Sequence, residues 1–391
     1  MKRVSLIFGT RAEAIKLCPL VLAFKDHSEF DPHVCVTGQH FQMLVQVLDA
    51  FGIKPDVDLE LMQPDQTLAG LTSGGITAID GYLGEHRPDL VIVQGDTTTA
   101  FCGALAAFYR RIPIGHVEAG LRTWDKFAPF PEEVNRVMIS RLADLHFAPT
   151  QWAFDNLVSE GVPRDRIYVT GNTVIDALQI ALGKVKASPP CIPGLPPRLV
   201  NGDCDQQIVL ITCHRRESIR EGFESICRAI AALAARNENV AFVYPVHLNP
   251  NVREPVFRIL DGQSNIYLIE PLDYLPFIAL MDRAKLILTD SGGIQEEAPS
   301  LGKPILVMRD TTERPEGVAA GTVRLVGTDS SRIQEEVSRL LSGDAVLGPK
   351  AWQKNPYGDG LAAGRIVGIC RQAANNWTAS VPQSLPSVNR R

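Results

Sequence analysis

The sequence predicts an α/β protein built from two doubly wound, Rossmann-like lobes with a cleft between them. Short apolar runs alternate with helical segments along nearly the whole chain, which is typical of parallel sheets covered by helices on both faces. A Pro- and Gly-rich stretch at 188–205 interrupts this alternation and is expected to be irregular, so the lobe boundary is expected between about residues 170 and 205. Polar residues follow the apolar runs where parallel strands would end, and ligands of such folds bind at that edge.

The 391 residues are enough for two to three domains. We expect a first lobe at 1–170 that also takes in a crossing helix at 361–380, a second lobe at 171–360, and a loose tail at 381–391.

Each expected strand of the first lobe is a short apolar run that ends in a Gly or polar turn. These runs lie at 4–8, 33–37, 89–94, 114–117, 145–148 and 166–169. The helices between them are expected at 12–22, 68–83, 100–109, 132–143 and 152–160. A further helix follows the second strand and ends at residue 51, and 53–64 is expected to be a connection.

The second lobe repeats the pattern. Its strands are expected at 208–212, 240–244, 266–269, 286–288, 305–307 and 323–326. Its helices are expected at 222–236, 251–260, 275–283, from 294 onward and at 333–341, with a last helix at 361–375.

Composition excludes several classes of protein. Apolar residues make up 45% and charged residues 21% of the chain, which supports a sizeable core. The net charge of −5 argues against a nucleic-acid or membrane partner. No apolar run approaches a membrane span, and the apolar start is too short for a signal peptide. The eight cysteines form no CxxC pair and are typical of reduced thiols in a cytoplasmic protein. No dinucleotide fingerprint, Walker A sequence or HExxH motif is present, so no cofactor and no metal is expected.

The stretch 286–307 carries the clearest ligand signal. It is an apolar run, a Ser291-Gly292-Gly293 turn, a helical segment, a stop at Gly302 and a second apolar run. Glycines let the backbone approach a phosphate, and the helix that follows offers free N–H groups. Glu296 and Glu297 would lie in the first turn, where either carboxylate could bind the hydroxyls of a ribose or could only complement the helix dipole.

A second anion site is expected after the first strand. The turn Gly9-Thr10-Arg11 opens a helix, and Arg11 and Lys16 lie on or near its first turns. A helix N-terminus with two cations suits an anion.

Three acids follow expected strand ends in the first lobe, namely Asp96, Glu118 and Glu132. His214 follows a strand of the second lobe and begins the run His214-Arg215-Arg216. Carboxylates with a pKa raised by burial suit proton transfer, and the cations suit a diphosphate.

Each acid also has a structural explanation. Asp96 could cap the following helix, Glu118 could pair with Arg122, and Glu132 could complement a helix dipole.

Three further residues have open assignments. His116 lies inside an apolar run and is expected to be a hydrogen-bonded core residue. His247 follows a strand end and could reach the cleft. Arg314 lies in a long polar loop that is typical of a binding segment, although a solvated salt-bridge loop is the alternative.

At these residues the chain resembles the non-hydrolysing UDP-N-acetylglucosamine 2-epimerases of bacteria. The matching segments, which cover nearly the whole chain in order, are FGTRAEAIK (8–16), GDTTT (95–99), GHVEAGLRT (115–123), PEEVNR (131–136), TGNTVIDAL (170–178), HRRES (214–218), YPVHLNPNVREPV (244–256), LTDSGGIQEEAPSLGKP (288–304), VMRDTTERPEG (307–317) and NPYGDG (355–360).

The resemblance implies a glycosyltransferase-B-like fold and the interconversion of UDP-GlcNAc and UDP-ManNAc, in a cytoplasmic homodimer. It implies that the catalytic residues are Asp96, Glu118, Glu132 and His214. It implies that UDP-sugar binding falls to Arg11, Lys16, Asp96, Glu118, His214, Phe277, Ser291, Gly292, Gly293, Glu297 and Arg314, with UDP in the second lobe. Phe277 would lie against the uracil and Glu297 on the ribose. The alternative function is a UDP-sugar glycosyltransferase of the same two-lobed fold.

The chain departs from the family pattern at a few positions. Gln94 replaces a common histidine, Cys213 a usual glycine and Phe41 a usual arginine. Gly74 falls where the family often has an arginine linked to a second, activating substrate site. The candidates that remain for such an allosteric site are Gln39, Gln42, Arg215 and His247.

Overall fold

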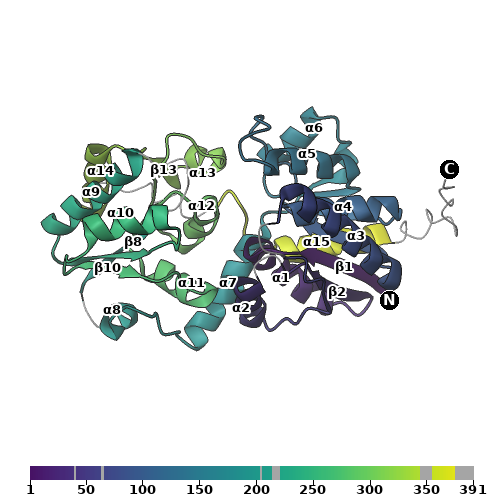
Figure 1. The fold of residues 1–391 in the computed structure, drawn as a ribbon, viewed down its shortest axis with the longest axis horizontal. Coiled ribbons are helices and arrows are strands. Elements are labelled where there is room, and N and C mark those ends of the chain that lie inside the picture. The colour runs from purple at the N-terminus through teal and green to yellow at the C-terminus, as the bar shows by residue number, and fades with distance from the viewer. Residues whose placement is uncertain (39–40, 63–65, 203–204, 214–220, 344–354, 375–391) are drawn as a thin grey trace. The chain divides into compact units, whose positions relative to one another are not determined.

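The computed structural model describes residues 1–38, 41–62, 66–202, 205–213, 221–343 and 355–374. The described chain divides into two compact units. Unit 1 contains Met1–Ala177 and the described residues from Gly360 onward, and unit 2 contains the described part of Leu178–Asp359. Each unit is a parallel sheet with helices packed on it (Figure 1), so the predicted α/β class with two doubly wound lobes is confirmed.

Unit 1 is built on a seven-stranded sheet with the order β3-β2-β1-β4-β5-β6-β7. Its strands are β1 (Lys2–Phe8), β2 (Phe30–Val36), β3 (Val57–Asp58), β4 (Leu90–Gln94), β5 (Ile114–Val117), β6 (Leu145–Ala148) and β7 (Ile167–Val169). Its helices are α1 (Arg11–Lys25), α2 (Phe41–Phe51), α3 (Leu68–His86), α4 (Thr98–Tyr109), α5 (Glu132–Leu142), α6 (Gln151–Ser159), the 3-10 turn η1 (Arg164–Arg166), the start of α7 (Thr173–Ala187) and α15 (Ala362–Ala373).

Unit 2 is built on a six-stranded sheet with the order β10-β9-β8-β11-β12-β13. Its strands are β8 (Gln207–Thr212), β9 (Val240–Pro245), β10 (Ile266–Ile269), β11 (Leu286–Thr289), β12 (Ile305–Val307) and β13 (Val323–Leu325). Its helices are the rest of α7, α8 (Pro197–Asn201), α9 (Glu221–Arg236), α10 (Pro250–Leu260), α11 (Tyr274–Arg283), α12 (Gly292–Glu297), the 3-10 turn η3 (Ala298–Leu301), α13 (Pro315–Ala319) and α14 (Ser330–Ser342).

The central strands bury both faces, which is why they read as unbroken apolar runs in the sequence. Val4, Leu6, Ile7 and Phe8 of β1 have no exposed surface, and each such side chain contributes about 1.5–3 kcal/mol when it leaves water. Three of the fully buried strands, namely β5, β6 and β12, were predicted residue for residue, as was the half-buried edge strand β10.

The strand order positions the site. In unit 1 the winding reverses between β1 and β4, and in unit 2 it reverses between β8 and β11. Loops at the carboxyl ends of such neighbouring strands lie on either side of a gap that helices do not cover. The predicted site residues Arg11, Asp96 and Ser291 each follow one of these four strands.

The last helix, α15, packs against α1 in unit 1 (Figure 1). The Asp176 carboxylate accepts hydrogen bonds from the backbone N–H groups of Ala362 and Ala363 at 3.2 and 2.8 Å, which caps the start of α15. Arg365 donates to the carbonyl of Thr170 at 3.0 Å. These bonds attach α15 to the rest of unit 1.

Two expectations about irregular segments were wrong. The connection expected at 53–64 contains β3, which pairs with β2 at the sheet edge. The Pro-rich stretch 188–205 contains α8, because Pro197 occupies the first helical position, where no N–H group is needed. The first helix after β7, α7, was not predicted. The tail expected at 381–391 lies outside the described residues.

A glycine after β5 is required by close packing. Gly120 has a φ of +96°, and a Cβ atom there would lie 2.2 Å from the carbonyl oxygen of Ala153.

We expect Gly120→Ala to lower the stability of unit 1 by more than about 2 kcal/mol, because the backbone of α6 must move as well. The measurement is the thermal unfolding midpoint. The control is Gly161→Ala, which has a similar φ of +85° but open space around it, and which should cost only about 1 kcal/mol. Equal midpoints for the two variants would contradict the packing argument.

Candidate active site

Two of the predicted acids lie at neighbouring strand ends in unit 1. Asp96 comes two residues after β4 and Glu118 one residue after β5, and these strands pair in parallel with Gln94 opposite Val117. Glu118 lies close enough to Asp96 to raise its pKa. The sheet therefore brings two carboxylates together, as the strand-end pattern predicted.

Glu118 is buried and held by charge and by amides. Its Oε1 atom lies 2.5 Å from the Nζ atom of Lys16 and 3.2 Å from the Nδ2 atom of Asn172. The Gln94 side chain donates to its other oxygen. The backbone of Glu118 has a φ of +64°, a conformation that non-glycine residues rarely adopt and that often marks functional sites. The ammonium and the amides stabilise the ionised carboxylate.

Asp96 pairs with an arginine from α5. The Nε and Nη2 atoms of Arg136 donate to its Oδ2 atom at 3.0 and 2.5 Å, and the Asp96 side chain is 24% exposed. Burial raises the pKa of Asp96, Arg136 lowers it, and the charge of Glu118 raises it again, with a net upward shift. A carboxyl group with a raised pKa is suited to exchange protons near neutral pH.

The structural explanations for these two acids are wrong. The cap of α4 is Thr97, whose hydroxyl accepts from Ala100 N–H at 3.0 Å. Arg122 pairs with Glu160, with N–O distances of 2.6 and 2.8 Å. Both sequence alternatives had assumed pairing between near neighbours in the chain, whereas Arg122 reaches α6.

Glu132 is half-buried in the first turn of α5. It lies one helical turn before Arg136, about 5.4 Å along the axis. Its neighbour Glu133 accepts from the backbone N–H groups of Thr123 and Trp124 at 3.1 and 3.0 Å, and also pairs with Arg136. The start of α5 is thus joined both to Asp96 and to the loop before it.

The predicted anion site at α1 has the expected helix start. Thr10 is the N-cap. The Glu13 carboxylate accepts a hydrogen bond from the backbone N–H of Thr10 at 2.8 Å, which completes a capping box. Arg11 is half-buried in the first turn, and Lys16, one turn later, pairs with Glu118. Burial raises the pKa of Glu13.

His116 is the core residue that its position in an apolar run predicted. It is 1% exposed, and its Nε2 atom lies 2.7 Å from the carbonyl oxygen of Gly95. Burial lowers its pKa to about 3, so the ring is neutral and Nε2 carries the proton.

Sequence reasoning missed three partners of these acids, namely Gln94, Arg136 and Asn172, and it missed Glu13, which accepts from Thr97 next to Asp96. For Arg136 a signal existed, because it follows Glu132 by four residues and therefore shares its helix face. Glu13 stands three residues after Thr10, which is the spacing of a capping box. For Asn172 the signal was its position after the strand β7, at the same edge of the sheet as Glu118, although its link to Glu118 spans 54 residues.

In unit 2, the expected Ser-Gly-Gly turn after β11 is shorter than predicted, because Gly292 and Gly293 are already the first two residues of α12. Ser291 is the N-cap of α12, which begins two residues before the predicted helix start at 294. Gly302 follows η3 with a φ of +66° and ends it, as predicted. The Thr289 hydroxyl accepts from Ser291 N–H at 3.0 Å, which fixes the entry to the turn.

Helix α12 carries two buried acids, Glu296 and Glu297. Glu296, 1% exposed, accepts from Arg314 at 2.5 Å. The expectation that Glu296 and Glu297 lie in the first turn was wrong, because they are the last two residues of α12, where a carboxylate does not complement the helix dipole. The Arg314 side chain is only 11% exposed, so it is not a solvated side chain. Glu297 is 8% exposed in the same helix.

The segment 355–357 supports this ion pair. Asn355 donates to the carbonyl oxygen of Glu296 at 2.7 Å. The buried Tyr357 hydroxyl donates to the carbonyl of Arg314 at 3.3 Å and accepts from Gly317 N–H at 3.1 Å. Arg314 and Glu296 are thus each fixed through their backbone.

The remaining predicted residues are placed as follows. Phe277 is half-buried in α11. His247 is exposed and accepts from Asn249 N–H at 3.1 Å, in a turn before α10. Gln39, His214 and Arg215 lie outside the described residues, as does the side chain of Gln42 in α2.

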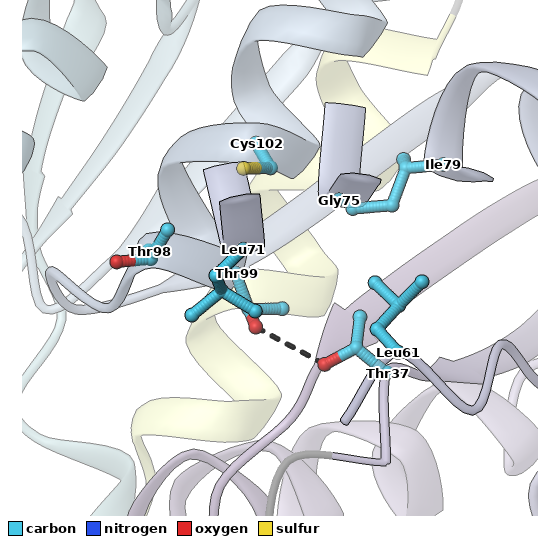
Figure 2. Close-up of a pocket in the computed structure, with 8 residues that line it drawn as sticks. All are labelled: Thr37, Leu61, Leu71, Gly75, Ile79, Thr98, Thr99 and Cys102. Carbon is cyan, nitrogen blue, oxygen red and sulfur yellow. Dashed lines mark hydrogen bonds between the residues drawn. The ribbon is translucent and has the colours of Figure 1, made fainter. Parts of the chain in front are cut away.

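A small pocket in unit 1 lies beside the start of α4 (Figure 2). It is too small for a water molecule, and the hydroxyls of Thr37 and Thr99 bond at 3.1 Å next to it. Its lining comes from Thr37, Leu61, Leu71, Gly75, Ile79, Thr98, Thr99 and Cys102. None of the predicted site residues lines it, so it is a packing gap beneath the loop that carries Asp96.

Within the described ranges, no three His, Cys, Asp or Glu side chains gather closely enough to hold a metal ion. No helix in that part of the chain is long and apolar enough to cross a membrane.

Two parallel-sheet units, one with paired carboxylates and one with a glycine turn beside a buried Arg–Glu pair, define a two-lobed α/β enzyme. The family model of UDP-N-acetylglucosamine 2-epimerase matches residues 22–371. The chain is 54% identical over 365 residues to the UDP-N-acetylglucosamine 2-epimerase of Salmonella typhimurium, covering 93% of this chain and 97% of that protein. The chain therefore belongs to the UDP-N-acetylglucosamine 2-epimerase family.

Solved structures agree with this assignment. The structure of UDP-GlcNAc 2-epimerase from Neisseria meningitidis bound to UDP-GlcNAc is similar with a TM-score of 0.85 and 47% identity, covering 95% of this chain and all of that one. A glycosyltransferase from Rickettsia africae has a TM-score of 0.61 at 13% identity, covering 97% of this chain and 99% of that one. The second likeness shows a shared fold alone, which fits the expected glycosyltransferase-B-like architecture.

The pairing of Asp96 with Arg136 can be tested by titration. Arg136 lowers the pKa of Asp96 against the effects of burial and of Glu118. We expect Arg136→Met to move the pKa of Asp96 further upward, measured from the 13C shift of its carboxyl carbon against pH. The control is Arg141→Met, at an exposed position of the same helix, which should leave the titration in place. An unchanged or lower pKa in Arg136→Met would contradict the ion pair.

Proposed function

We propose that this protein interconverts UDP-N-acetylglucosamine and UDP-N-acetylmannosamine by eliminating UDP from the sugar and adding it back. The observation that carries the proposal is the pair of carboxylates at the ends of β4 and β5, each beside its own cation. The family of the chain and its likeness to an epimerase bound to UDP-GlcNAc support the choice of substrate.

The chemistry requires such a pair. The C2 proton of the sugar is not next to a carbonyl group, so direct proton removal is unfavourable. Breaking the bond from C1 to the UDP oxygen makes C1 electron-poor, and a carboxylate then takes the C2 proton, which gives a 2-acetamidoglucal and UDP. Protonation at C2 from the other face, with return of UDP to C1, gives the epimer. Inversion at C2 needs acid/base groups on two faces.

Unit 1 would supply these groups. We assign catalysis to Asp96, Glu118 and Glu132, together with His214 of unit 2. The ion pairs of Asp96 and Glu118 support the assignment, because a cation beside each carboxylate keeps two acids usable at neighbouring positions. Arg11 and Lys16 would help to hold the UDP-sugar, on which Asp96 and Glu118 would act.

Unit 2 would bind UDP. The turn Ser291–Gly293 would hold the diphosphate with Arg314, Phe277 would lie against the uracil, and Glu297 would bind the ribose. We further propose that the protein acts as a cytoplasmic homodimer and supplies N-acetylmannosamine units for cell-surface polysaccharide.

Turnover in D2O tests the reaction. Incubation of the protein with UDP-GlcNAc should give UDP-ManNAc with deuterium at C2, read by NMR and mass spectrometry. A UDP-sugar glycosyltransferase would instead release UDP only when an acceptor is present. Formation of UDP-ManNAc without deuterium at C2 would contradict proton exchange, and release of free N-acetylmannosamine would show a hydrolysing reaction.

The carboxylates are tested separately. We expect Asp96→Asn and Glu118→Gln each to lower kcat by about 10²–10⁴-fold, since general acid–base groups contribute that much. The Kd for UDP should stay within about threefold, because UDP binding is assigned to unit 2. The matched control is Asp80→Asn, which breaks the surface ion pair with Arg110 and should leave kcat unchanged. Rates near those of the wild type in both site variants would remove the catalytic assignment.

A further inference from the structure

The turn that carries Asp96 is held at three consecutive residues by three different elements. The carbonyl oxygen of Gly95 accepts from His116 of β5 at 2.7 Å. The carbonyl oxygen of Asp96 accepts from the Nδ2 atom of Asn135 of α5 at 2.9 Å. The Thr97 hydroxyl donates to Oε1 of Glu13 in α1 at 2.6 Å.

The three holding side chains are all buried. Glu13 is 0%, His116 1% and Asn135 8% exposed. Water does not compete for buried hydrogen bonds of this kind, and a buried polar group that loses its partner lowers the stability of the fold. These buried bonds therefore restrain the position of the 95–97 turn.

Glu13 connects two strand-to-helix turns. Its Oε2 atom accepts from Gly9 N–H at 3.1 Å and from Thr10 N–H at 2.8 Å, while its Oε1 atom accepts from Thr97. The first turn begins α1, which carries Lys16, and Lys16 pairs with Glu118. One buried carboxylate thus sets the spacing between the loop after β1 and the loop after β4.

We propose that Glu13, His116 and Asn135 are positioning residues that hold the 95–97 turn so that Asp96 stays aligned with Arg136 and Glu118. The inference rests on the proposed function, in which Asp96 reacts with the sugar, and it adds residues that touch no reacting atom. Displacement of a reacting group by about 1 Å is enough to lower a rate by about 10²-fold.

The first test removes one bond at a time. His116→Leu removes the donor to Gly95, and His116→Gln restores an N–H group near the position of Nε2. Thr97→Val removes the donor to Glu13, and Thr97→Ser restores it. We expect both apolar variants to lower kcat by about tenfold or more, with KM for UDP-GlcNAc and Kd for UDP within about twofold, and the polar variants to recover most of kcat.

The control for Thr97→Val is Thr150→Val. Both threonines cap a helix of unit 1, since Thr150 accepts from Ala153 N–H at 3.1 Å at the start of α6. Thr150→Val should lose stability and keep kcat. If it lowers kcat as much as Thr97→Val does, the effect comes from the lost cap and the inference is wrong.

A double-mutant cycle tests whether the effect passes through Asp96. In an Asp96→Asn background, His116→Leu and Thr97→Val should cause no further fall in the residual rate, because the group they position is already absent. Independent, multiplied losses would overturn the inference.

A titration decides the inference without turnover. In His116→Leu and Thr97→Val the pKa of Asp96, followed by 13C NMR, should rise, because a displaced carboxylate loses part of its contact with Arg136. If the wild type forms no UDP-ManNAc, the proposed function fails, and this titration still separates a positioned Asp96 from an unaffected one. An unchanged titration in folded variants would refute the positioning role.

Discussion

Asp96 and Glu118 lie at neighbouring strand ends, and each carboxylate needs a cation beside it. The placement of α1 and α5 in unit 1 depends on this constraint. Asp96 and Glu118 repel each other in a site that is largely withdrawn from water, and such repulsion pushes one of them to take a proton. Arg136 of α5 and Lys16 of α1 offset this repulsion. Because the two cations come from different helices, both helices have to be held against the sheet, and the buried bonds of Glu13 and Asn135 connect them to the loop between β4 and α4.

Unit 2 uses the same chemistry for a different purpose. The buried carboxylate of Glu296 pairs with Arg314, and Asn355 and Tyr357 bind the backbone of these two residues. A buried ion pair adds little stability of its own, since desolvation offsets most of the attraction. Its use here is orientation, because a guanidinium fixed at one edge by Glu296 keeps its other N–H groups in a defined direction. In the proposed function that direction is toward the diphosphate.

The sequence predicted the fold better than it predicted the site, for a physical reason. Strands buried on both faces require continuous apolar runs, so β5, β6 and β12 were predicted residue for residue, whereas the two-residue edge strand β3 buries too little to leave a pattern. The strand ends also located Asp96 and Glu118, because parallel strands deliver their following residues to one edge. Their partners could not be read in the same way, since Lys16 meets Glu118 across 102 residues and Arg136 meets Asp96 across 40. Nearest-neighbour pairing, as assumed for Arg122, is the wrong rule in a wound sheet.

The glutamine at position 94 shows how a departure from the family pattern acts on the site. A histidine is common there in the family that the sequence resembles, and a histidine ring changes its charge near neutral pH. Gln94 donates an amide hydrogen to Glu118 and has no charge to change. The Lys16 ammonium also contacts Glu118, at 2.5 Å. At position 94 this chain therefore holds Glu118 with an uncharged amide, so the hydrogen bond from this position does not change with pH as one from an imidazole would.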